Sequence, residues 1–281
     1  MITQASLFHP GPFRLAEGPV LIESSLWWVD IPAGTLHSLS TQSNEHRSWR
    51  VSEELSAALP TTDPNRWLVT TTNDIAVFHL ETNSLDTLHT PEPKLDTRFN
   101  DAKVSPIGSL FAGTMHRDCE QSIAHLYELT PEFELRTCLQ GITISNGLGW
   151  SPDNSSMYYI DTPTARLEAF DARQPINDSA DRRTIFDFAN IEGHPDGLTV
   201  DADGMIWVAL YAGARIVRID PQQHTIIDQV HVDAPNPTSC TLSHGPNPKL
   251  YITTAATAQT PGQIFQATAP SPGLPPTRFA V

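Results

Sequence analysis

A short apolar run occurs six times along the 281-residue chain, and this repeat restricts the fold more than any other feature. The runs begin at residues 26, 66, 109, 156, 205 and 249, so that successive runs are 40 to 49 residues apart. Most of them follow a turn-forming segment, such as Ser151-Pro-Asp-Asn or Asp201-Ala-Asp-Gly. A period of this length indicates one supersecondary unit per repeat, as in propellers and related arrays.

A second strand is expected after each run, because segments such as Ile75–Leu80 and Arg166–Phe170 alternate apolar with polar or small residues. The 24 prolines and 15 glycines between these segments leave little room for long helices. We therefore predict an all-β fold, a six-bladed β-propeller of four-stranded antiparallel blades that forms a single domain over residues 1–281. A β-sandwich or stacked barrels is the alternative, although neither requires a constant period.

The two chain ends are expected to close the ring. A strand from Ile2 to Phe8 would complete the blade that the C-terminal strands begin, which leaves no sheet edge exposed there. Residues 277–281 form another extended run. Truncation at either end should therefore destabilise the fold.

Charge and composition exclude several classes of partner. The formal charge is −15, and the acidic residues are scattered along the chain, so nucleic acid would be repelled. No signal peptide occupies residues 1–15, and no apolar stretch is long enough for a membrane span. The three cysteines are odd in number and form no Cys-x-x-Cys pair, which argues against a disulfide framework. We predict a cytoplasmic protein, a monomer or small homo-oligomer, with no nucleic-acid or membrane partner.

Polar residues recur at one phase of the repeat, nine or ten residues before each apolar run. In a propeller, such equivalent positions lie at the same height around the central channel. Carboxylates and amide oxygens that converge in a narrow channel repel one another unless a cation lies among them. The second repeat has the apolar Ala57 at this phase, and the other five have Glu17, Asn100, Asn146, Asp196 and Ser239.

Oxygen donors without histidine or cysteine favour a hard cation such as Ca²⁺, Mg²⁺ or Mn²⁺, with Fe²⁺ or Zn²⁺ also compatible. We therefore predict one divalent cation on the axis. The spacing alone leaves an alternative open, in which these residues are hydrogen-bonding caps that close the channel around water. Motifs of serine hydrolases, zinc peptidases, P-loop proteins and dinucleotide-binding proteins are absent from the sequence.

Several strings resemble the SMP-30/gluconolactonase family, also called the regucalcin family, in the same order and across nearly the whole chain. The strings are Glu17-Gly-Pro, Arg98-Phe-Asn-Asp-Ala-Lys-Val, Phe111-Ala-Gly-Thr-Met, Ser145-Asn-Gly-Leu-Gly-Trp-Ser-Pro-Asp, Pro195-Asp-Gly-Leu-Thr-Val-Asp and Pro237-Thr-Ser-Cys. The resemblance implies a six-bladed propeller with one divalent cation and lactonase activity. It also implies metal ligation by Glu17, Asn146 and Asp196 and substrate contacts from Arg98 and Asn100.

The chain departs from the family pattern in two places. Asn100-Asp101-Ala102 stands where many members have Asn-Asp-Gly. After Met115, at a point where members often place an acidic residue near the substrate, the chain has His116-Arg117-Asp118. We expect Asp118 to take that substrate-binding role and His116 to reach the mouth of the pocket. Alternatively, His116 is an ordinary polar residue of a loop, without a role in the site.

These features together predict a metal-dependent hydrolase that opens a small sugar lactone, such as a glucono- or pentonolactone, to the sugar acid. Asp196 is the expected catalytic base, since the resemblance implies that it touches both ion and substrate. Two alternatives remain: a phosphotriester or aryl-ester hydrolase that uses the same metal site, and a non-enzymatic calcium-binding propeller.

Overall fold

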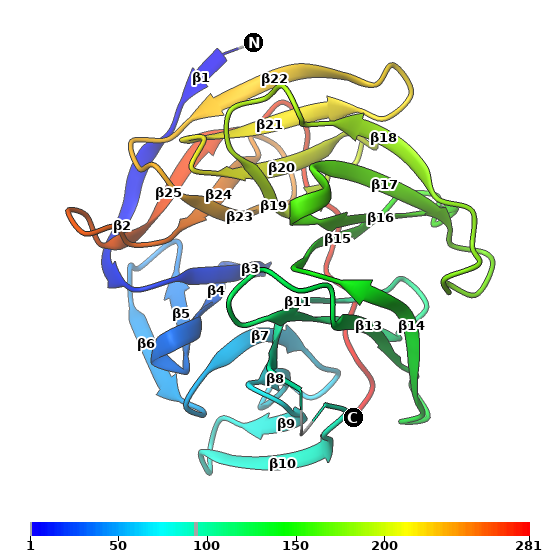
Figure 1. Ribbon diagram of the computed structural model, residues 1–281. Coiled ribbons are helices and arrows are strands. Elements are labelled where there is room, and N and C mark those ends of the chain that lie inside the picture. The colour runs from blue at the N-terminus through cyan, green and yellow to red at the C-terminus, as the bar shows by residue number, and fades with distance from the viewer. Residues whose placement is uncertain (1, 93–94) are drawn as a thin grey trace.

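Six β-sheets are arranged around a central axis in the computed structural model, which describes residues 2–92 and 95–281 (Figure 1). Five sheets have four strands and one has five. Within each blade, strands that follow one another in sequence pair antiparallel. The prediction of an all-β, six-bladed propeller is therefore confirmed.

The four strands of a blade run from the axis to the periphery. The innermost strands are β3 (Ala16–Ile22), β7 (Leu55–Pro60), β11 (Thr97–Val104), β15 (Ser145–Trp150), β19 (His194–Val200) and β23 (Pro237–Leu242). The second strands are β4 (Ser25–Asp30), β8 (Arg66–Thr71), β12 (Leu110–His116), β16 (Ser156–Asp161), β20 (Ile206–Tyr211) and β24 (Lys249–Thr254). These second strands coincide with the six apolar runs, which confirms the repeat.

The third strands are β5 (Thr35–Ser40), β9 (Ile75–His79), β13 (Ala124–Leu129), β17 (Arg166–Asp171), β21 (Arg215–Asp220) and β25 (Gly262–Thr268). The outer strands are β6 (His46–Arg50), β10 (Ser84–His89), β14 (Leu135–Ile142), β18 (Arg183–Asp187), β22 (Thr225–His231) and β2 (Ser6–Phe13). Two short 3₁₀ turns, η1 (Ile31–Ala33) and η2 (Thr162–Thr164), follow β4 and β16. Within the described residues, no helix is long and apolar enough to cross a bilayer.

Each of the six innermost strands has a register shift at the same phase of the repeat. In β15 the shift lies between Asn146 and Leu148, and in β19 it lies between Pro195 and Leu198. A bulge bends the strand and redirects a side chain. The bulges therefore occur where the sequence has its phase-matched polar residues, and they set the height of the candidate site in the channel.

Glycine follows three of these polar residues, and at two of the three glycines the neighbouring inner strands approach closely. A Cβ atom on Gly147 would lie 2.7 Å from the carbonyl oxygen of Asp196. A Cβ atom on Gly197 would lie 2.3 Å from the Oγ of Ser239. Real side chains do not tolerate such distances, so the narrow channel requires glycine at both positions.

The N-terminus closes the ring, but the expected strand boundaries were wrong. Instead of one strand from Ile2 to Phe8, the chain forms β1 (Ile2–Gln4), which pairs parallel with β22 of the fifth blade. The backbone N–H of Ala5 donates to the carbonyl of His231 at 2.8 Å, and β2 then begins at Ser6. β2 pairs with β25 and completes the sixth blade. The N-terminal segment thus pairs first with the fifth blade, through β1, and then with the sixth blade, through β2.

The C-terminal residues 277–281 belong to none of the six sheets. Beyond β25 the chain crosses from the fifth blade, where Gly273 bridges Asp201, to the second blade, where Phe279 bridges Thr61. Figure 1 shows this red segment passing behind the centre of the ring. Phe279 is fully buried in a core cluster between blades, which anchors the segment.

Three histidines lie where β2 packs against the first blade. The Nδ1 atom of His37 and the Nε2 atom of His46 are 3.1 Å apart, and the His9 ring lies 4.8 Å from that of His46. The rings of His37 and His46 are both nearly parallel to Trp28. Burial, with smaller contributions from the other two histidines, lowers the pKa of His37 to about 4. The ring closure is therefore built on histidines that are neutral near pH 7.

We expect mild acid to weaken this closure. The unfolded chain binds a proton at His37 near pH 6.5, whereas the folded protein does so near pH 4, so stability falls as the pH decreases through that window. Between pH 7 and pH 5 the free energy of unfolding should fall by about 2 kcal/mol through His37 alone. Urea unfolding at both pH values, compared between wild type and His37→Phe, measures this. An unchanged pH dependence in the variant would contradict the assignment.

Candidate active site

Glu17, Asn146 and Asp196 project from equivalent bulges on three inner strands, β3, β15 and β19. All three are buried, with 8%, 5% and 9% of their surface exposed. The backbone N–H of Gly18 donates to Glu17 Oε2, which is a contact with its own neighbour in sequence. These three residues are called the ligand ring below.

The positive charges near the ligand ring compensate its two carboxylates only in part. Burial and the charges of Asp196 and Asp101 raise the pKa of Glu17 well above its usual range. Burial and Asp101 likewise raise the pKa of Asp196 well above its usual range, although a hydrogen bond from the Gly197 backbone and the charge of Arg98 oppose the shift. Charged carboxylates in such a place are costly unless a cation neutralises them. The donor set therefore fits a divalent cation that prefers oxygen ligands.

An amide chain orients Asn146. Its side-chain N–H donates to Thr162 Oγ1 at 2.8 Å, and its Oδ1 accepts from Asn100 Nδ2 at 2.9 Å. The same Asn100 amide also donates to the Ser145 carbonyl at 2.9 Å. Thr162 in turn donates to the Pro195 carbonyl at 2.7 Å, next to Asp196. A carbonyl oxygen has two lone pairs, so Asn146 Oδ1 keeps one for a cation.

Asn100 makes three hydrogen bonds within the protein. Both of its amide hydrogens are used within the protein, and its Oδ1 accepts from Arg98 Nη1 at 3.0 Å. Asn100 therefore links Arg98 to Asn146 and orients both side chains. Arg98 Nη1 also donates to the Phe99 carbonyl at 2.8 Å, while no described residue accepts from its Nε or Nη2. Arg98 is thus the residue with donors available to a ligand.

Arg98 and His116 lie at the same end of the channel. In the β11–β12 ladder, Arg98 is opposite Met115 and Thr97 is opposite His116. Tyr211, opposite His194 at the start of β19, marks the same end in the fifth blade. Its pKa is raised by burial and by the charge of Asp196. We call this end, which holds Arg98, His116 and Tyr211, the substrate face.

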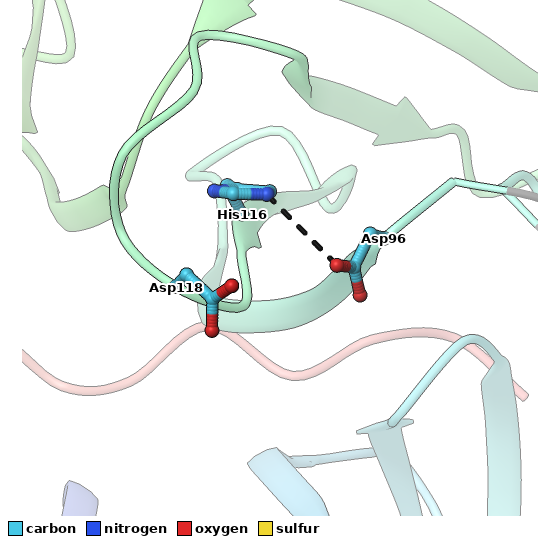
Figure 2. Close-up of side chains that lie close together, drawn as sticks. All are labelled: Asp96, His116 and Asp118. Atoms are coloured by element: carbon cyan, nitrogen blue, oxygen red, sulfur yellow. Dashed lines mark ion pairs between the residues drawn. The ribbon is translucent and has the colours of Figure 1, made fainter.

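Asp96, His116 and Asp118 form a second cluster on the substrate face, and Figure 2 shows their side chains turned toward one another. Their ligand atoms lie within 4.8 Å of each other, which is a spacing that a metal ion could bridge. His116 is buried, whereas both aspartates are exposed. The His116 Nε2 atom is 4.0 Å from Asp96 Oδ2.

The hydrogen bonds of His116 argue against metal binding in this cluster. Its Nδ1 accepts from the backbone N–H groups of Glu120, at 3.2 Å, and Gln121, at 3.1 Å. A neutral ring that accepts at Nδ1 carries its proton on Nε2, so the atom facing the aspartates is a donor. The cluster suits a hydrogen bond to a ligand oxygen better than a metal.

Residues 15–256 match the family described as SMP-30/Gluconolactonase/LRE-like region. The chain is 34% identical to the putative sugar lactone lactonase YvrE of Bacillus subtilis (strain 168) over 278 residues, which cover 95% of each chain. This chain belongs to that family.

Solved structures support the fold. The chain is similar to a luciferin-regenerating enzyme with a TM-score of 0.89 and 28% identity, covering 96% of this chain and 97% of that one. It is also similar to a calcium-binding protein, regucalcin, from Agrobacterium tumefaciens, with a TM-score of 0.90. There the identity is 23% and the coverage 100% and 99%, so this second likeness supports the fold alone.

Three residues of the site had no role in the sequence interpretation. Asp101 follows Asn100 and reinforces the negative potential around the ligand ring. Thr162 lies in η2 and connects the fourth blade to the fifth. Tyr211 ends β20. Asp101 lies inside one of the family-like strings. Thr162 follows a second strand and Tyr211 ends one, so both lie outside the phase that marked the inner strands.

Proposed function

We propose that this protein hydrolyses a small sugar lactone, with one divalent cation held by Glu17, Asn146 and Asp196. The observation that carries the proposal is the buried pair of carboxylates on the channel axis, next to an amide oxygen with a free lone pair. Family membership and the name of the Bacillus subtilis relative support a lactone as the substrate.

The cation, when bound, supplies Lewis acidity toward an ester carbonyl and toward an attacking water. Three protein ligands leave coordination positions open, which a purely structural ion would not need. Calcium is the first candidate, because the expected ligands are all oxygen atoms and Ca²⁺ prefers oxygen ligands.

Asp196 acts as the base in this proposal. It accepts the proton of the water that attacks the lactone carbonyl carbon, as a carboxylate beside the attacking water can do. Arg98 directs its free guanidinium donors at the oxyanion that develops. When the ring C–O bond breaks, Asp196 returns the proton to the departing ring oxygen, which yields the sugar acid.

Donors on the substrate face favour a hydroxylated ring over an aliphatic one. Arg98 offers charged N–H donors, His116 offers Nε2–H, and Asp118 accepts from hydroxyl groups. Asn100 orients Arg98 and Asn146 in this scheme. A polyhydroxylated lactone would satisfy these groups, whereas a fatty-acyl lactone would leave them unpaired.

A panel of aldonolactones tests the proposal, assayed after chelation and after addition of Ca²⁺, Mg²⁺, Mn²⁺, Fe²⁺ or Zn²⁺ one at a time. We expect hydrolysis only with metal and a preference for sugar lactones over aryl esters and phosphotriesters. A stronger preference for aryl esters or phosphotriesters would favour the alternative hypothesis of a phosphotriester or aryl-ester hydrolase at the same metal site. Metal binding without hydrolysis of any of these substrates would favour a non-enzymatic calcium-binding propeller.

The ligand assignment predicts the metal content of two variants. Glu17→Gln and Asp196→Ala each remove a carboxylate from the ligand ring, so both should retain less metal than wild type after dialysis against trace calcium. Elemental analysis of the purified proteins measures this. Asp171→Asn, at an exposed carboxylate of β17, is the control and should keep full metal content. Full occupancy in both ring variants would show that the ion lies elsewhere.

A further inference from the structure

A cavity lies on the opposite side of the ligand ring from the substrate face. Its volume is about 320 Å³, and all six inner strands contribute lining residues that follow the phase-matched positions in sequence. Residues 274–277 of the C-terminal segment also line it. We call this space the lower chamber.

Asp101 and Lys103 carry opposite charges into the lower chamber. They are two residues apart on β11, and the surface of each lines the cavity. Lys103 Nζ donates to the carbonyl of Leu198 at 3.0 Å. Leu198 belongs to β19 of the fifth blade, whereas β11 belongs to the third, so the lysine side chain crosses the channel below the fourth blade's inner strand.

The charges of this pair reach the ligand ring. Burial raises the pKa of Asp101, while Lys103 opposes that shift. Burial lowers the pKa of Lys103, and the charges of Asp101 and Glu17 oppose it. Asp101 also acts on both ring carboxylates, as described above. The site therefore contains three carboxylates with one ammonium group below them.

We propose that Asp101 and Lys103 are positioning residues that set the affinity of the ligand ring for a divalent cation, Asp101 increasing it and Lys103 decreasing it. The proposal rests on the metal site of the proposed function. Lys103 serves as a permanent counter-ion that holds the carboxylates together before a metal binds. Because it shares the sign of the metal, it limits how tightly the metal is held.

The two charges predict shifts of opposite sign. At the effective dielectric of a protein interior, a unit charge several ångströms from a divalent ion changes its binding by at least about ten-fold. Lys103→Met should therefore tighten calcium binding, and Asp101→Asn should weaken it, each by about ten-fold or more. The double variant should bind with nearly the wild-type Kd. A merely structural ion pair would instead weaken binding in both single variants.

Calorimetric titration of the chelated proteins with CaCl₂ measures these affinities without any substrate. Lys103→Arg keeps the charge and should bind like wild type, and Lys103→Gln replaces the methionine variant if that protein does not fold. The matched control is Arg136→Met, which removes a positive charge paired with Glu128 on the outer strands of the same blade. It should leave the calcium Kd unchanged.

Weaker calcium binding by Lys103→Met or Lys103→Gln would overturn the proposal, and so would an equal effect of Arg136→Met. Glu17→Gln distinguishes a failure of the proposed metal site from a failure of the role proposed for Asp101 and Lys103. If it binds calcium as tightly as wild type, the ligand ring is not the metal site, and both the proposed site and the role of the pair are wrong. If Glu17→Gln loses calcium, the metal site stands, and the direction in which Lys103→Met shifts the calcium Kd decides whether the pair has the proposed role.

Discussion

Asp196→Asn is expected to lose about 10²- to 10⁴-fold in kcat on sugar lactones while it retains part of its metal. The amide oxygen of asparagine can still ligate a cation, but a neutral amide cannot accept the proton of the attacking water. Steady-state kinetics together with metal analysis of the same preparation measure both effects.

The Asp171→Asn protein serves as the matched control, because it makes the same substitution at an exposed carboxylate away from the axis. It should retain wild-type kcat. Near-wild-type turnover of metal-loaded Asp196→Asn would exclude Asp196 as the base and would move that role to another carboxylate of the channel.

Arg98→Ala should keep the metal and lose about 2 to 4 kcal/mol of transition-state stabilisation on sugar lactones. Arg98 lies above the ligand ring, and its Nε and Nη2 have no acceptor among the described residues, so its contribution is to the ligand. A small lactone without hydroxyl groups should be affected less by this change than by Asp196→Asn. Values of kcat/KM for both lactones, measured for both variants, test this difference.

Arg117→Ala controls for the general loss of positive charge near the substrate face, since Arg117 is already paired with Glu54 at 3.0 Å. It should have a much smaller effect on kcat/KM. If Arg98→Ala abolishes metal binding while Asp196→Asn remains near wild type, the roles given to these two residues are wrong.

The repeat made most of the fold predictable. Second strands are buried between blade neighbours along most of their length, so runs such as the one beginning at residue 205 must be apolar, and their similar spacing follows from blade size. The ends were harder to predict. β1 pairs with the fifth blade and the C-terminal segment crosses the channel, because both contacts join residues more than 70 apart in sequence. Local patterns contain no information about such partners.

The sequence by itself determined the blade number, the polar phase of the inner strands and the oxygen character of Glu17, Asn146 and Asp196, because these depend on periodicity and residue type. Only the tertiary structure decided what neighbouring side chains do. It showed that Asn100 uses its amide within the protein and that His116 presents a donor. It also showed that Lys103 reaches another blade below the ligand ring. Hydrogen-bond direction and cross-channel contacts depend on how blades face one another, and that arrangement exists only after the ring has closed.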